Sequence, residues 1–217
     1  MEISQRTLAI LENFSLINKS ICINEEGYLK NISEAKNLIG LAKIEEKFPN
    51  FSIFDLTEFC QVIKMFDTNK ELNFTFTSDE VIINQGNTKV NYRFCNPDHI
   101  YNKCNEYEKY MANGDYLASF ELPEEQMNGI LKASKVMSLK TLNIGVDEDK
   151  SEISLFDEDN SAANQYRVEI EGNGSCDVNL DTSLFNFIRG DYDVFVFPKY
   201  VKFVKGDICY ILLNKSL

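Results

Sequence analysis

The sequence is short of several residue types on which common active sites depend. It has a single histidine, no tryptophan and only four prolines. Its six cysteines are widely scattered and form no C-x-x-C pair. This spacing excludes an ordinary zinc site and fits reduced thiols that fill apolar space. The one histidine, His99, follows Pro97 and Asp98 and has no partner for catalysis in the sequence, so we interpret it as a connector residue.

Long apolar runs and enzyme motifs are also absent. The N-terminus lacks a basic segment followed by an apolar one, and no stretch reaches the length that spans a membrane. The sequence contains no glycine-rich phosphate loop, no nucleophile elbow and no carboxylate pair at a recognisable spacing. We therefore expect an intracellular protein that is not an enzyme and that needs no catalytic residue, metal ion, cofactor or membrane.

Two acidic clusters, residues 147–149 and 157–160, are the remaining candidates for a cation site. Neither has the glycine at the sixth position and the terminal glutamate that an EF-hand loop needs. We interpret both as surface turns. A hydrolase that uses these acids is the least favoured of the functional hypotheses.

Positive charge is scarce: the sequence has 22 lysines and arginines but 34 aspartates and glutamates, which gives a net charge of −12. The electric field of so negative a protein repels phosphate, so any contact with nucleic acid must be local. Nevertheless, three candidate helices carry polar and basic residues at spacing i, i+4, i+7, opposite an apolar stripe. These triplets are Thr57/Gln61/Lys64, Asn128/Lys132/Lys135 and Thr182/Asn186/Arg189. An acidic chain that keeps acids off these faces is expected to meet an anionic target there.

The length of 217 residues suits two domains of about 100 residues each. Short strand-like runs, separated by turns such as Gln85-Gly86-Asn87 and Lys205-Gly206-Asp207, predict antiparallel meanders in both halves. Four short helices interrupt them, and Asp55 with Glu58 predicts the N-terminal cap of the second. Residues 96–113 break the strand rhythm and predict an ordered connector. The predicted fold class is α+β.

The first and fourth helices are the less regular ones. The first runs from about Gln5 to Ile17, and its expected outer face, with Arg6 and Asn13, also includes Ile10 and lies near Glu12. Its expected buried residues are Leu8, Leu11 and Phe14, and those of the fourth helix are Leu184, Phe187 and Ile188.

This layout of two similar halves with basic helix faces resembles that of ring-shaped DNA sliding clamps. The local sequence is similar to the trimeric clamp of T4-type bacteriophages. The matching stretches are residues 8–20, residues 53–56 with Phe59, residues 131–135 with 141–142, and residues 190–192. The resemblance spans nearly the whole chain.

The resemblance implies a DNA-clamp fold with two similar domains of antiparallel β-sheet, each with two short helices, and subunits that assemble into a ring. The implied domains are residues 1–96 and 116–217, joined by a connector at 97–115. In the family, helices line the hole of the ring and face duplex DNA. The implied DNA-facing residues are Arg6, Lys64, Lys132, Lys135 and Arg189.

The resemblance also implies partners. They are double-stranded DNA bound without sequence preference, the replicative DNA polymerase, the clamp loader ATPase and late-transcription factors, with the chain itself a homotrimer in the cytoplasm of an infected bacterial host. Peptide tails of such partners dock in an apolar pocket in the family. The candidate pocket residues here are Tyr107, Tyr110, Met111, Phe197, Pro198, Tyr210 and Leu212.

Two functions stay open at this point. The first is a processivity factor that encircles duplex DNA and tethers the replicative polymerase. The second is a non-enzymatic interaction module whose basic helix faces bind an acidic protein partner.

Overall fold

The computed structural model describes residues 1–67, 70–100, 114–160 and 162–215. The chain divides into two compact units, Met1–Glu106 and Tyr107–Leu217, which we call unit 1 and unit 2. Most of the predicted connector, residues 97–115, lies outside the described residues, so the predicted domain boundaries stay a prediction.

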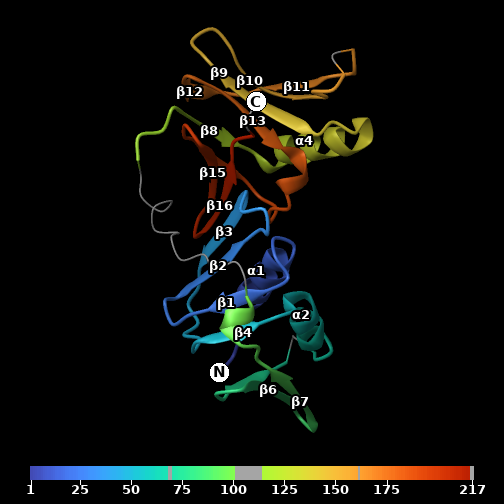
Figure 1. The fold of residues 1–217 in the computed structure, drawn as a ribbon, viewed down its shortest axis with the longest axis vertical. Coiled ribbons are helices and arrows are strands. Elements are labelled where there is room, and N and C mark those ends of the chain that lie inside the picture. The colour runs from blue at the N-terminus through green and yellow to red at the C-terminus, as the bar shows by residue number, and fades with distance from the viewer. Residues whose placement is uncertain (68–69, 101–113, 161, 216–217) are drawn as a thin grey trace. The chain divides into compact units, whose positions relative to one another are not determined.

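Among its described residues, unit 1 has two α-helices that lie side by side, α1 (Gln5–Ser15) and α2 (Leu56–Lys64) (Figure 1). Its other elements are β1 (Ile21–Ile23), β2 (Tyr28–Ile32), β3 (Leu38–Lys43), β4 (Phe51–Ile53), β5 (Asn73–Phe76), β6 (Glu80–Gln85), β7 (Thr88–Arg93) and the 3₁₀ turn η1 (Pro97–His99). All strand pairs described within the unit are antiparallel: β1 with β4, β2 with β3, and β5-β6-β7 as a meander.

The core of unit 1 lies where strands and helices turn apolar faces toward each other. In β6, Val81 and Ile83 are fully buried while the residues between and after them are partly exposed, which is the alternation of a strand with one face on a core. In α1 the buried residues Thr7, Ile10 and Phe14 recur at helical spacing.

In the described part of unit 2, strands are more numerous, and the long helix α4 (Glu124–Met137) packs against β10 and β11 (Figure 1). The unit's other elements are β8 (Ala118–Leu122), β9 (Thr141–Val146), β10 (Ser151–Phe156), β11 (Tyr166–Glu169), β12 (Gly172–Gly174), β13 (Cys176–Asp181), the 3₁₀ turn η2 (Thr182–Leu184), β14 (Tyr192–Val196), β15 (Tyr200–Lys205) and β16 (Ile208–Leu213). The strands form two antiparallel arrays, β11-β10-β9-β13 and β12-β8-β14-β15-β16.

The predicted α+β class with antiparallel meanders is confirmed by these pairings. Strand β12 was not predicted, because Gly172–Gly174 has no side-chain pattern to reveal it. Gly174 has φ +101°, and a Cβ there would lie 2.1 Å from the carbonyl oxygen of Leu117. Only glycine lets β12 approach β8 so closely.

Candidate nucleic-acid interface

The outer face of α2 carries the first predicted triplet. Thr57, Gln61 and Lys64 are exposed, as predicted. The opposite face buries four residues of the helix, namely Leu56, Phe59, Cys60 and Ile63. The helix begins where the carboxylate of Asp55 accepts a hydrogen bond from the backbone N–H of Glu58 at 2.9 Å, which confirms the predicted cap.

Lys64 does not stand alone on this face. Its Nζ lies 3.0 Å from Oε2 of Glu12, so an ion pair joins α2 to α1. Both side chains are partly exposed, and such a surface pair contributes about 0–1 kcal/mol to stability. Beneath this ion pair lies Cys60. Burial is the main cause that raises the pKa of its thiol to about 12, and the nearby Glu12 charge is the second, so this cysteine is an inert core residue.

Helix α1 presents Arg6 to solvent, but the predicted position of Ile10 was wrong. Ile10 is fully buried, because Thr7, Ile10, Leu11 and Phe14 form one stripe at i, i+3, i+4, i+7. The exposed Arg6 guanidinium donates to the carbonyl oxygen of Lys43 at 3.0 Å.

Helix α4 carries the second predicted triplet. Asn128, Lys132 and Lys135 are exposed, while Met127 and Ile130 are buried, so the predicted division of faces is confirmed. Among the described residues no acid lies within 4.0 Å of the Lys132 or Lys135 ammonium. Acidic residues of this helix stand instead in its first turn, at the positive end of the helix dipole.

The third triplet is not on a helix, and this prediction was wrong. Only Thr182–Leu184 forms a 3₁₀ turn, and the chain is irregular from there to β14. Phe185 is buried and its ring contacts that of Phe187, two residues later, at 5.1 Å between centroids. A spacing of two residues brings side chains together in an extended chain and separates them in a helix. Arg189 is exposed, but a loop presents it.

Two buried tyrosines fix this loop, a role that was not predicted for either of them, since Tyr210 was expected in the partner pocket. The hydroxyl oxygen of Tyr210 accepts from the N–H of Ile188 at 3.2 Å, and the hydroxyl of Tyr192 donates to the Ile188 carbonyl. The Tyr210 ring also stacks on Phe187 with centroids 4.3 Å apart. Burial raises the pKa of both hydroxyls well above their ordinary value, so both stay protonated at neutral pH.

The predicted pocket residues are only partly brought together. Tyr107, Tyr110 and Met111 lie outside the described residues. Tyr210 and Leu212 are fully buried and Phe197 is nearly so, which leaves Pro198 as the exposed one among those described. Pro198 lines a hollow of about 730 Å³ in unit 2, together with Phe156, Lys199 and the exposed Leu213.

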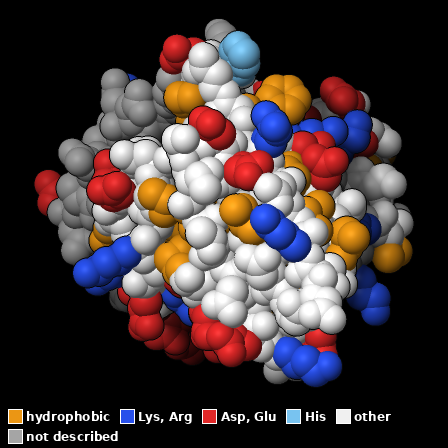
Figure 2. Space-filling view, turned by 90° about the horizontal axis from the view of Figure 1, so that it is seen from below, with side chains coloured by type: hydrophobic (Ala, Val, Ile, Leu, Met, Phe, Trp, Pro, Cys, Tyr) orange, Lys and Arg blue, Asp and Glu red, His pale blue; other side chains and the backbone are white. Residues whose placement is uncertain are grey.

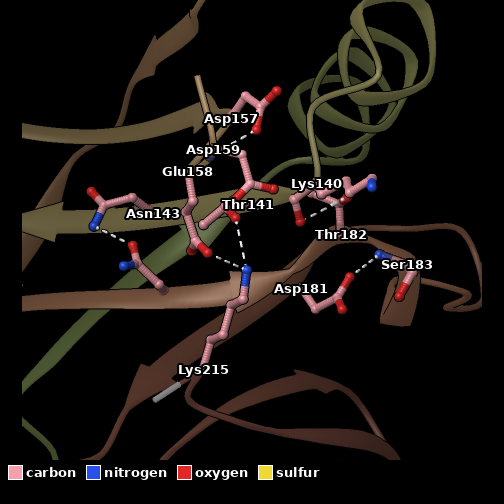
Figure 3. Close-up of polar contacts among 11 residues, drawn as sticks. Lys140, Thr141, Asn143, Asp157, Glu158, Asp159, Asp181, Thr182, Ser183 and Lys215 are labelled. Atoms are coloured by element: carbon pink, nitrogen blue, oxygen red, sulfur yellow. Dashed lines mark hydrogen bonds and ion pairs between the residues drawn. The ribbon is translucent and has the colours of Figure 1, made fainter. Parts of the chain in front are cut away.

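Lys215 is another lining residue of this hollow. Its ammonium lies 2.6 Å from a Glu158 carboxylate oxygen and donates to the Thr141 hydroxyl at 3.1 Å (Figure 3). Its backbone N–H donates to the Asn179 carbonyl at 2.7 Å. The hydrogen bond from Lys215 is the largest of the causes that hold the pKa of the Glu158 carboxyl below its ordinary value. These contacts tie the chain end to β9 and β13.

The acidic clusters are turns, as predicted. One carboxylate oxygen of Asp147 accepts from the N–H groups of Asp149 and Lys150, at 2.9 and 2.7 Å. Asp157 accepts from the N–H of Asp159 at 3.0 Å. Over the described ranges, no group of three His, Cys, Asp or Glu side chains is placed to hold a metal ion.

On the face drawn in Figure 2, acidic and basic side chains lie scattered among apolar and uncharged polar groups, and no broad basic surface appears. In the part of the chain that the structure describes, no helix is long and apolar enough to cross a membrane.

The chain is similar in sequence to one phage protein over its whole length. It is 25% identical over 225 residues to the sliding clamp of Vibrio phage KVP40, and the match covers 100% of each chain. No protein-family model matches the chain.

The chain also shares its fold with solved structures. The chain matches proliferating cell nuclear antigen of A. fulgidus, solved with a C-terminal region of FEN-1 bound, with a TM-score of 0.72 at 12% identity over 97% of this chain and 95% of that one. It matches the DNA polymerase III β subunit of Borrelia burgdorferi with a TM-score of 0.73 at 12% identity, over 100% of this chain and 62% of that longer one. The chain is therefore similar over its whole length to a phage sliding clamp, and it shares its fold with the solved PCNA and DNA polymerase III β subunit.

Proposed function

We propose that copies of this chain close into a homotrimeric ring around duplex DNA and tether the replicative DNA polymerase to its template. The observation that carries the proposal is the placement of positive charge. A chain of net charge −12 exposes Lys64, Lys132 and Lys135 on helix faces whose triplets contain no acid. The alternative, an interaction module that binds an acidic protein, is not favoured, because the full-length similarity is to a sliding clamp.

The proposed DNA-facing residues are Lys64 on α2, Lys132 and Lys135 on α4, Arg189 in its loop, and Arg6 on α1. All five are exposed. A ring needs only weak contacts of this kind, because dissociation requires opening the ring. A protein held by six to ten phosphate contacts alone would lose about 10³-fold or more in affinity between 50 and 200 mM salt.

Edge strands supply the means to close the ring. Within the described part of the chain, β7 is an edge of the unit 1 meander and β11 is an edge of a unit 2 array. An unpaired strand edge of one copy can pair with an edge of the next, and head-to-tail pairing of unlike edges generates a ring. The acidic surface of each subunit would discourage DNA from binding to the outside.

The hollow at Pro198 is the proposed docking site for partner peptides. It lies on unit 2 and combines apolar groups of Pro198, Phe156 and Leu213 with the cations of Lys199 and Lys215. A few polar groups around an apolar floor suit a short peptide. Tyr107, Tyr110, Met111 and Phe197 stay candidates for this site, whereas Tyr210 and Leu212 are buried in the core of unit 2.

The proposed users of this site are the polymerase, the clamp loader ATPase and late-transcription factors. The proposed place of action is the cytoplasm of an infected bacterial host, where phage DNA is replicated.

Encirclement can be tested without a loader. Linear duplex DNA is incubated with concentrated protein, so that rings thread over its ends, and both ends are then capped by streptavidin on terminal biotins. We expect capped DNA to retain the protein through gel filtration, and uncapped DNA to lose it. Equal retention on capped and uncapped DNA would contradict encirclement.

A further inference from the structure

The cations of the two units differ in what surrounds them. In unit 1, Lys64 is paired with Glu12 at 3.0 Å, and Arg6 donates to the Lys43 carbonyl at 3.0 Å. In unit 2, Lys132 and Lys135 are exposed, and no acid of the described residues lies within 4.0 Å of either ammonium.

The pairing of Lys64 follows from the packing of α1 against α2. Glu12 and Lys64 stand at the rim of a small hollow of about 150 Å³ between the helices, over Leu8, Cys60 and Ile63. The side chains of Glu12 and Lys64 are 38% and 60% exposed, so the pair sits at the surface and faces solvent. Glu12 is therefore near enough to neutralise Lys64 and open enough to be displaced.

A paired cation attracts a phosphate less than a free one does. From a distance, the two opposite charges act as a dipole, whose field falls off faster than that of a single charge. At physiological salt, screening over about 8 Å weakens what remains. A phosphate that binds Lys64 must also break its contact with Glu12, whereas a phosphate that binds Lys132 or Lys135 displaces no acid.

We propose that Glu12 attenuates the grip of unit 1 on DNA by occupying Lys64, so that the lysines of α4 supply most of the attraction to phosphate. This inference rests on the proposed function, because it assumes that α1, α2 and α4 face the duplex. Its consequence is a ring that holds DNA more weakly than its count of exposed cations implies. Weak contacts suit a protein that must slide.

The test compares Glu12→Gln with a matched control, Glu34→Gln. Glu34 is an exposed acid between β2 and β3 of the same unit, so both variants change the net charge equally. Duplex binding is measured by fluorescence anisotropy as a function of salt, with each melting temperature as a check on folding. If Glu12→Gln adds one phosphate contact, affinity should fall about threefold more than in the wild type between 50 and 200 mM salt, given a slope of about 0.9 per contact. Glu34→Gln should leave the slope unchanged.

A double-mutant cycle with Lys64→Gln decides whether the effect passes through Lys64. We expect Glu12→Gln to increase affinity when Lys64 is present and to have no effect beside Lys64→Gln. Lys132→Gln with Lys135→Gln should weaken binding more than Lys64→Gln does in the wild-type background. An equal gain in both Lys64 backgrounds, or a gain from Glu34→Gln as large as that from Glu12→Gln, would overturn the proposal.

The same variants separate this proposal from the proposed function. Wild-type protein that is lost equally from capped and uncapped DNA would overturn the proposed function, and this inference with it. Wild-type protein that is retained on capped DNA, together with a Glu12→Gln variant whose salt slope is unchanged, would overturn this inference alone.

Discussion

At the scale of single residues, the Tyr210 hydroxyl holds the loop that carries Arg189. It accepts the backbone N–H of Ile188 at 3.2 Å from within the core of unit 2, where the tyrosine side chain is fully buried. The Tyr192 hydroxyl and the Lys205 ammonium hold the same stretch, because they donate to the carbonyl oxygens of Ile188 and Arg189. The Tyr210 hydroxyl is therefore one of three groups that fix the backbone beside this surface cation.

We predict that Tyr210→Phe lowers the free energy of unfolding by about 1–3 kcal/mol, because the Ile188 N–H is left without its acceptor in a partly buried place. The measurement is denaturant unfolding followed by circular dichroism. Tyr116→Phe is the control, because Tyr116 is 51% exposed and should lose no stability. Equal stability of Tyr210→Phe and the wild type would show that the hydroxyl does not hold the loop.

A second residue-scale prediction concerns pH. The pKa of Glu158 is lowered by the hydrogen bond from Lys215, so the folded state favours the ionised carboxylate. The stability that the ionised Glu158 gives to the folded state is fully present above the ordinary carboxyl pKa, and it is lost as the pH falls through the lowered pKa. We expect exchange of the Lys215 amide hydrogen, measured by NMR and corrected for intrinsic exchange, to be better protected at pH 6 than at about pH 3.

The control for this pH effect is Glu158→Gln. Its Lys215 amide should be poorly protected at both pH values, because glutamine offers no charge to the ammonium. Protection that falls with pH equally in the variant and the wild type would assign the effect to another group.

At the scale of elements, the sequence predicts best where caps and helical period agree. Asp55 with Glu58 and an apolar stripe at i, i+3, i+4 place α2 correctly, and the face of α4 follows from the same period. The helix predicted from Thr182 was wrong. Polar and basic residues there have helical spacing, but the aromatic residues of the same stretch pack as an extended chain. Local spacing could not show that tyrosines from two later strands, β14 and β16, bind the Ile188 backbone.

The cap of α2 gives the element-scale prediction. Asp55→Ala removes the acceptor of the Glu58 N–H, which should lower the free energy of unfolding by about 0.5–2 kcal/mol. Thermal unfolding by calorimetry measures the change. Asp79→Ala, at an exposed position before β6, is the matched control and should change stability little. A loss as large in Asp79→Ala would point to net charge instead of the cap.

At the scale of the whole molecule, net charge and fold limit in different ways how the chain can contact DNA. The net charge of −12 excludes a protein that coats DNA, while the clamp fold allows local contacts to suffice. The residues that line the hollow at Pro198 were predictable only in part, because the burial of Tyr210 and Leu212 depends on how β15 and β16 pair. From the strand pattern alone, Leu212 and the exposed Leu213 cannot be told apart.

The last prediction separates ring closure from phosphate contact by their response to salt. Strand pairing and apolar burial are little screened, whereas phosphate contacts weaken steeply with salt. Light scattering at micromolar concentration should therefore give about three times the chain mass of 25.0 kDa in both low and high salt.

In about 0.5 M salt, anisotropy should detect no binding to open duplex, because its contacts are screened. Rings already threaded on capped DNA should nevertheless be retained, because no contact has to survive for a closed ring to stay. A strict monomer, or release from capped DNA at the salt concentration that abolishes binding to open duplex, would mean that contacts hold the protein and encirclement does not.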